Sequence, residues 1–152
     1  MIDLATIGTR HAATVARLGR LIDAAPGIRV HIRSQNPLRL GDSFEPEPDL
    51  LVVTWREDFY ARPHPVGANV RLLIEVADST LRYGTQIKVL LYARHGVPEV
   101  WIIGLEGGQL MRYRQPQGEG YTLVDVMSRP GVLVPDAAPE LVLDLSGLPL
   151  SL

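Results

Sequence analysis

Two acidic residues occupy positions where a carboxylate could hold a metal ion. Glu75 lies in the apolar segment 70–77, where an unpaired carboxylate in a central strand is costly unless it is protonated or bound to metal. Asp49 opens the preceding apolar segment, 50–55, so two adjacent strands would bring both carboxylates within reach of one ion. Mg²⁺ takes one or two protein carboxylates and completes its shell with water and phosphate oxygens. The pair is therefore a candidate magnesium site.

Both residues also have a purely structural interpretation. Glu75 could form a salt bridge to an arginine such as Arg71 or Arg112, and Asp49 follows a proline, as turn residues commonly do. The residues alone leave the two interpretations open.

A lysine and a tyrosine are spaced one helical turn apart further along the chain. Lys88 and Tyr92 would share one side of a predicted helix. A lysine beside a metal site can stabilise charge that develops on a phosphate, and Tyr92 could orient that lysine or the attacking water. The alternatives are a solvated helix lysine and a tyrosine that packs with its hydroxyl at the rim.

The elements that must position these residues follow from hydrophobic periodicity and from turn residues. Helices are predicted over 10–25 and 85–95. Strands are predicted over 28–33 (which 38–40 continue or pair with), 49–55, 70–77 and 99–103. Short strands over 109–114, 121–126 and 141–145 would extend the sheet in antiparallel fashion. The order helix, strand, strand, strand, helix, strand predicts an α/β (α+β) fold with a mixed sheet flanked by helices.

Length and composition narrow the class of protein. The 152 residues predict a single domain over 1–152, with 107–152 as a C-terminal β extension. The chain has no cysteine, which excludes disulfides, thiolate metal sites and cysteine nucleophiles. It shows neither a signal peptide nor an apolar run of about 20 residues, so we expect a cytoplasmic protein with no membrane contact and no organic cofactor.

Five segments in order resemble the Uma-two family of restriction-endonuclease-like proteins, within the PD-(D/E)XK nuclease superfamily. These segments are 10–13 (RHAA), 35–40 (QNPLRL), 45–50 (EPEPDL), 74–79 (IEVADS) and 88–102, which contains YARHGVPEVWI. The resemblance extends over nearly the whole chain from Gly8 to about Leu145. It implies the restriction-endonuclease-like core, helix-strand-strand-strand-helix-strand, in the order derived above.

The resemblance also implies a reaction. Asp49 and Glu75 would be the metal carboxylates, and Mg²⁺ (or Mn²⁺) would support hydrolysis of DNA phosphodiester bonds. The superfamily usually places a lysine two residues after the glutamate, where this chain has Ala77; the family is similar to members whose lysine has moved to the following helix, here Lys88. Many relatives carry aspartate four residues before that lysine, where this chain has Gly84. If that aspartate is only a helix N-cap, glycine costs little there; if it takes part in the site, Gly84 marks a weakened enzyme. Relatives also usually carry an additional N-terminal segment, whose contribution we expect to be absent.

The main rival is a catalytically degraded nuclease fold that serves as a dimeric interaction or nucleic-acid-binding module. Gly84 and the net charge of −2 favour it, because binding DNA requires a local basic stripe. Candidates for that stripe are Arg29, His31 and Arg33 on one strand face. Arg10, Arg17 and Arg20 on the first helix are further candidates, although a solvated helix face is the favoured interpretation for those three.

Other side chains were assigned to structure or to assembly. His11, at the first turn of the first helix, could face the site, but a helix-start cap or a surface position is the favoured interpretation. Trp55 and Trp101 are interpreted as core or interface residues. A twofold homodimer is expected through aliphatic positions of the C-terminal segment. Those positions are Leu133, Val134, Leu141, Val142 and Leu143.

Overall fold

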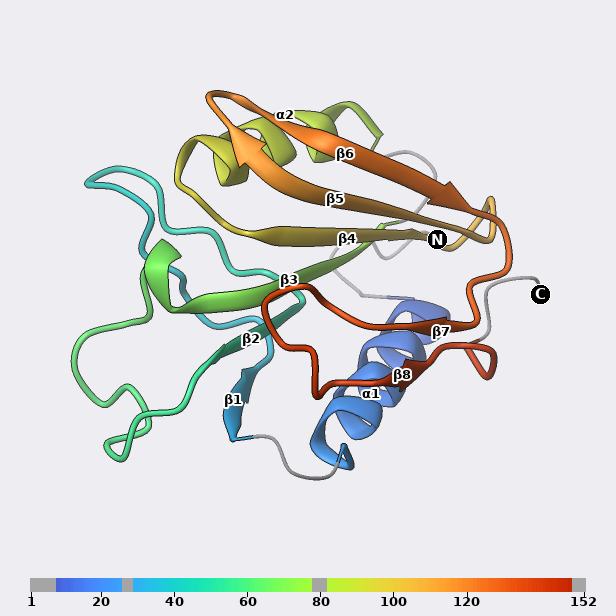
Figure 1. Ribbon diagram of the computed structural model, residues 1–152, viewed down its shortest axis with the longest axis horizontal. Coiled ribbons are helices and arrows are strands. Elements are labelled where there is room, and N and C mark those ends of the chain that lie inside the picture. Colours follow the sequence, from blue (N-terminus) through green and yellow to red (C-terminus); the bar gives the residue numbers. More distant parts are fainter. Residues whose placement is uncertain (1–7, 26–28, 78–81, 149–152) are drawn as a thin grey trace, which may run out of the picture.

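The computed structural model describes residues 8–25, 29–77 and 82–148. A six-stranded mixed sheet forms its centre, with the strands in the order β1-β2-β3-β4-β5-β6 (Figure 1). The strands are β1 (Val30–Arg33), β2 (Leu50–Thr54), β3 (Val70–Ala77), β4 (Glu99–Gly104), β5 (Gln109–Gln117) and β6 (Gly120–Met127). Only β3 and β4 pair in parallel among these neighbours, and the helix between them makes the crossover that parallel strands require.

One helix covers each face of the sheet. Helix α1 (Thr9–Asp23) lies on one face, and α2 (Arg82–Arg94) lies on the other (Figure 1). This arrangement confirms the predicted fold class and the predicted order of its six core elements. None of the helices within the described residues is long and apolar enough to cross a membrane.

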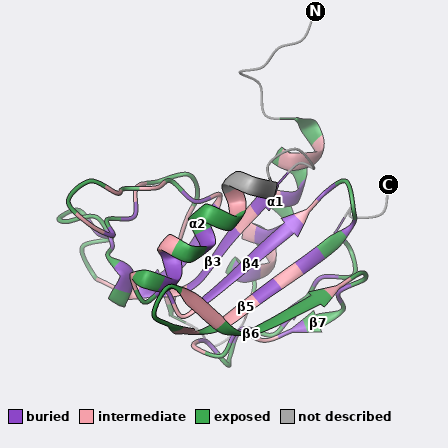
Figure 2. Ribbon diagram, turned by 90° about the horizontal axis from the view of Figure 1, so that it is seen from above, coloured by how far each residue is buried: buried purple, intermediate pink, exposed green. Residues whose placement is uncertain are grey.

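Two apolar layers hold the helices to the sheet. The layer under α1 includes Leu18 and Ile22 of the helix together with Val52, Ile74 and Trp101 of the strands. A separate set packs beneath α2, and these residues are Leu51, Val53, Leu73, Val89, Tyr92, Val100 and Ile102. Strands β3 and β4 are buried along most of their length because both faces are covered, whereas β6 is largely exposed (Figure 2).

The C-terminal segment departs from the predicted extension in its last part. β5 and β6 extend the sheet antiparallel as predicted, but β7 (Val132–Leu133) and β8 (Leu143–Asp144) pair with each other as a separate ribbon beside α1 (Figure 1). Leu133, Leu141 and Leu143 are buried in the layer beneath α1. These three positions serve the core of their own chain, so assigning them to a dimer interface was wrong. Of the other two positions assigned to it, Val142 is exposed and Val134 is half-buried.

Residues 38–40 also have a different partner from the one predicted. The Arg39 amide donates a hydrogen bond of 2.8 Å to the carbonyl of Pro65, and Arg39 forms an isolated parallel bridge to Val66 rather than continuing β1. The neighbouring η1 turn (Gly67–Asn69) packs against the end of α2. A Cβ on Gly67 would lie 2.5 Å from the carbonyl oxygen of His95, so this close approach requires glycine.

Candidate active site

Asp49 and Glu75 are neighbours because of the register of two antiparallel strands. Leu50 of β2 pairs with Ile74 of β3, so the next position on each strand places Asp49 opposite Glu75. Two like charges directly opposite each other oppose strand pairing. The prediction that adjacent strands bring the two carboxylates together is confirmed as a matter of placement.

The Asp49 carboxylate accepts a backbone hydrogen bond from β3 at the point where the β2–β3 pairing ends. Its Oδ2 accepts a hydrogen bond of 2.8 Å from the amide of Val76, and its own amide donates to Glu75 Oε1 at 3.4 Å. Nε2 of His11, at the start of α1, lies 3.3 Å from Asp49 Oδ2, and Gln35 Nε2 donates to Oδ1 at 3.4 Å. These contacts make Asp49 far more than a turn residue.

Glu75 faces α2, which supplies both of its side-chain partners. The hydroxyl of Tyr92 donates a hydrogen bond of 2.7 Å to Oε2, and Lys88 Nζ lies 3.8 Å from the same oxygen. Tyr92 is fully buried, so its hydroxyl points inward to Glu75 instead of lying at the rim. Lys88 remains 53% exposed while contacting Glu75, so it is both solvated and part of the cluster.

Burial is the largest influence on the pKa values of Glu75 and Tyr92. Removal from water raises the pKa of Glu75, against the lowering effects of the Tyr92 hydrogen bond and the Lys88 charge, while Asp49 raises it further. The pKa of Tyr92 is also raised, first by burial and then by the Glu75 carboxylate. Tyr92 therefore remains a hydrogen-bond donor to Glu75 throughout the physiological pH range.

The two carboxylates open onto one cavity of about 290 Å³. Its lining comes from α1, the segment before β2, the end of β3, and α2; among these residues are His11, Glu47 and Lys88. Glu47 adds a third carboxylate to this lining, whereas the nearby Glu45 is not part of it.

The residue types suit a hard divalent cation. Each carboxylate has about four lone-pair positions, and the hydrogen bonds described above use only part of them. Among the described residues, no three His, Asp or Glu side chains come together as a metal-binding group. A two-carboxylate donor set fits Mg²⁺, which keeps several waters, and does not fit a closed structural zinc site.

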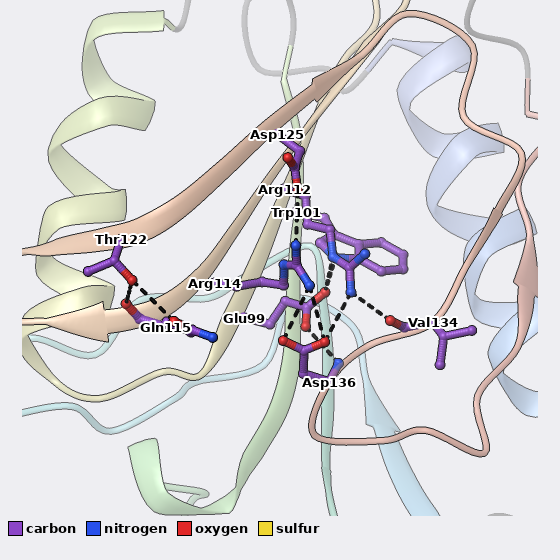
Figure 3. A network of polar contacts seen from close by, with 9 residues as sticks. All are labelled: Glu99, Trp101, Arg112, Arg114, Gln115, Thr122, Asp125, Val134 and Asp136. Carbon is purple, nitrogen blue, oxygen red and sulfur yellow. Dashed lines mark hydrogen bonds and ion pairs between the residues drawn. The ribbon is translucent and has the colours of Figure 1, made fainter.

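The salt bridges suggested for Glu75 are not formed. Arg112 Nε donates to Glu99 Oε2 at 2.7 Å, and Arg71 donates to the carbonyl of Ala137. Glu99 is fully buried and also accepts hydrogen bonds from Trp101 Nε1 (2.6 Å) and the Asp136 amide (2.9 Å) (Figure 3). Because every oxygen of Glu99 has a partner, this second acidic residue fastens β4 and β5 to the segment before β8.

Sequence reasoning missed several features of the site. The sequence gives no signal for the contact of Gln35 with Asp49. For His11 the less favoured of two interpretations is the correct one, because the side chain is largely buried against Asp49. The sequence also holds a signal that supports the choice of Lys88 as a site residue. Lys88 is the only lysine in a chain whose other basic residues, apart from histidine, are all arginine.

Comparison with known proteins places this chain in a family. The family model described as "Putative restriction endonuclease" (Uma2) matches residues 2–146. The chain belongs to the Uma-two family. A crystal structure described as a putative nuclease from Anabaena variabilis, of a family of unknown function, superposes on this Uma-two chain with a TM-score of 0.73 and 20% identity. The match covers 97% of this chain and 84% of that one, and it establishes the fold. No curated protein matches the chain.

The backbone at position 84 corrects one expectation about the Uma-two chain. Gly84 was interpreted as a helix N-cap, but α2 begins at Arg82, so Gly84 lies inside the first turn. The interpretation as a cap is therefore wrong. Glycine in a helix costs roughly 0.5–1 kcal/mol relative to alanine, so this position weakens the start of the helix that carries Lys88.

Proposed function

We propose that this Uma-two protein is a metal-dependent endonuclease that hydrolyses DNA phosphodiester bonds. Membership of a family described as restriction endonucleases supports the reaction class. In the proposal, Asp49 and Glu75 hold Mg²⁺ or Mn²⁺, Lys88 stabilises negative charge on the reacting phosphate, and Tyr92 positions Glu75.

The observation that carries the proposal is the convergence of Asp49, Glu75 and Lys88 on one cavity. Two carboxylates face each other from adjacent strands, and the chain's only lysine lies 3.8 Å from one of them. Opposed carboxylates do not favour strand pairing, and an apolar pair would pack at this position at lower cost. A cation held between the two acids would offset their mutual repulsion.

Each protein group then has a separate task. The Val76 amide and His11 hold the Asp49 carboxylate in place, and the Tyr92 hydroxyl does the same for Glu75. Lys88 is anchored at one end by Glu75, yet its exposure leaves the ammonium accessible to a phosphate that enters the cavity. When bound, a divalent cation lowers the pKa of water and offsets charge on the scissile phosphate.

The test is nicking of supercoiled plasmid by purified protein in Mg²⁺ or Mn²⁺. We expect the wild type to convert supercoiled DNA to nicked circles only with metal. Asp49→Asn, which keeps an acceptor for the Val76 amide, should be inactive at equal fold stability. Asp42→Asn is the matched control, because Asp42 is exposed and lies outside the cavity lining.

Calorimetric titration of MgCl₂ into the same samples separates the enzyme from its rival. Failure of both cleavage and metal binding in the wild type would overturn the proposal and favour the degraded nuclease fold. Metal-dependent cleavage that persists at full rate in Asp49→Asn would reject the assigned site.

The homodimer remains a prediction, and exposed apolar residues outside the C-terminal segment provide a further surface for it. β6 is an edge strand whose Val124 and Val126 are exposed, and Ile87 and Leu90 of the neighbouring α2 are exposed as well. Light scattering during gel filtration measures the mass directly. A monomer at about 100 μM would contradict a homodimer.

A further inference from the structure

A cluster of arginine and aromatic side chains extends along β1 to the end of β2 that is remote from the carboxylates. Figure 1 shows the loop after β2 at the opposite end of the sheet from the start of α2. The centre of the cluster is His31, which is buried and stacks on Trp55 with ring centroids 4.3 Å apart. We call Arg29, Arg33, Trp55 and Phe59 around His31 the arginine–aromatic cluster. His31 itself is too buried to serve as the exposed basic contact that the sequence suggested.

Phe59 presents its ring to solvent from a constrained backbone. It is 63% exposed, and its φ of 55° is followed by a φ of 59° at Tyr60. Positive φ is unfavourable for bulky residues and persists only where the surroundings enforce it. Here the buried Tyr60 enforces it, because its hydroxyl donates to the Thr54 carbonyl and its amide to Asp58. The loop therefore holds an aromatic surface outward at a cost in local strain.

Guanidinium groups surround this aromatic surface. Arg29 lies 4.6 Å from the centre of the Trp55 ring, and Arg33 lies 5.9 Å from that of Tyr60. Arg56 is occupied by an ion pair with Asp58, so the charge available to a ligand comes from Arg29 and Arg33. Within the described residues, Arg33 Nε and Trp55 Nε1 are buried without a hydrogen-bond acceptor. The cluster thus combines the positive charge of two arginines with an exposed ring.

The backbone connects this cluster to the candidate active site. Arg29, His31 and Arg33 alternate along β1 and so face the same side of the sheet. Val30 pairs with Thr54 and Arg33 with Leu51, after which Gln35 reaches Asp49 Oδ1 at 3.4 Å. Six strand positions separate Asp49 from Trp55, a span of about 20 Å. A stacked nucleic-acid strand covers that distance in about six nucleotides.

We propose that β1 and the 55–60 loop form a track for single-stranded DNA, in which one base stacks on Phe59 while Arg29 and Arg33 contact phosphates. The proposal rests on the proposed nuclease function, since it supplies the path by which a strand leaves the cavity. A polyanion complements the two arginines, and an exposed ring accepts any unpaired base through its face. A base pair inside a duplex does not offer that face, so the track selects unpaired strand.

Binding without cleavage tests the track. Fluorescence anisotropy of labelled dT₁₂ and dT₄ is measured with Asp49→Asn protein in EDTA at low salt. We expect dT₁₂ to bind at least tenfold more tightly than dT₄ and than a blunt 12-base-pair duplex. Phe59→Leu should weaken the binding of dT₁₂ on the order of tenfold, whereas Phe59→Tyr should retain the wild-type affinity.

Charge is tested in the same assay. Arg29→Gln with Arg33→Gln should reduce the slope of log affinity against log salt by about 1.4. Arg20→Gln, an exposed arginine on α1 across the sheet, is the matched control and should leave the slope unchanged. Equal affinity of the cluster variants and the wild type for dT₁₂, or equal binding of duplex and single strand, would overturn the track.

Nuclear magnetic resonance locates the contact independently of affinity. The chain has two indoles, and dT₁₂ should shift the Nε1–H signal of Trp55 while leaving that of the buried Trp101 in place. An unmoved Trp55 signal at saturation overturns the track even if plasmid cleavage is normal. Conversely, a shifted Trp55 signal in a protein that never cleaves DNA would support the track and reject the nuclease function.

Discussion

The hydroxyl of Tyr92, on the second helix, donates a 2.7 Å hydrogen bond to the carboxylate of Glu75 on the central strand. Both side chains are largely excluded from water, so this bond is the main means by which the protein stabilises the charged form of the acid. It also couples the position of α2, and therefore of Lys88, to the strand that would carry the metal.

Replacement of Tyr92 by phenylalanine isolates that bond. We expect Tyr92→Phe to lower the free energy of unfolding by about 1.5–3 kcal/mol, the range for hydrogen bonds to charged groups. The pKa of Glu75 should rise further, so the acidic limb of the pH–activity profile should move to higher pH. Urea unfolding and a pH series of nicking rates measure the two effects. A stability loss with an unmoved profile would mean that the Tyr92 hydroxyl stabilises the fold without setting the protonation of the catalytic group.

Glu75→Gln should separate stability from function. The folded state holds the Glu75 proton at pH values where the unfolded chain has released it, because burial raises the folded pKa above the usual 4.5. Glu75 therefore costs increasing stability as pH rises from about 4.5 through the folded pKa. We expect Glu75→Gln to be more stable than wild type at pH 7 without divalent ions, with a smaller difference at pH 4.

Magnesium provides the complementary measurement on the same pair. At ten times its dissociation constant, a cation that binds only the folded state adds about 1.4 kcal/mol to wild-type stability. Glu75→Gln should gain little from the same addition. Equal stabilisation of both proteins would place the metal elsewhere.

Lys88→Met should impair turnover without harming the fold. The side chain is half exposed, so the free energy of unfolding should change by no more than about 0.5 kcal/mol. If Lys88 stabilises charge on the phosphate, kcat should fall about 100-fold while KM and magnesium affinity stay near wild type. A matching loss of metal affinity would show instead that Lys88 acts through Glu75. Lys88→Arg tests whether a second kind of cation suffices at this position.

The Glu99–Arg112 pair should behave as a purely structural element. Arg112→Met leaves the fully buried Glu99 without its cation and should cost about 3–5 kcal/mol in urea unfolding. The double variant Glu99→Gln with Arg112→Met removes the stranded charge, so it should recover part of that loss. Arg114, whose partners are exposed, provides the control, and Arg114→Gln should cost less than about 1 kcal/mol. Absence of recovery in the double variant would mean that the hydrogen bonds of Glu99, and not its charge, set the cost.

The local pattern of apolar residues and prolines was sufficient to predict the central strands and the placement of Asp49 beside Glu75. The alternation around Glu75 and the proline before Asp49 determine strand boundaries, and the antiparallel register then brings the two carboxylates together. The contact between His11 and Asp49 joins positions 38 residues apart and leaves no periodic signal in the sequence. The pairing of Glu99 with Arg112 likewise depends on the register of β4 and β5, and the assignment of Arg112 to Glu75 failed for that reason.

The C-terminal segment shows a different limit of pattern. Leu141 and Leu143 have the alternation of a strand, and alternation specifies a face to bury but not the surface that buries it. In the folded chain that surface is the layer beneath α1, so the ribbon β7–β8 closes the core there instead of adding to the sheet edge.

The hydrogen bond from the Val76 amide to Asp49 makes the exchange rate of that amide proton sensitive to what the Asp49 carboxylate binds. That amide proton is retained by a carboxylate rather than by a neighbouring carbonyl, at the point where the β2–β3 ladder ends. Its exchange with deuterium is therefore governed by the same oxygen that a cation would engage. If a cation binds Asp49, the exchange rate of the Val76 amide resonance should change, and this can be measured before any substrate is known.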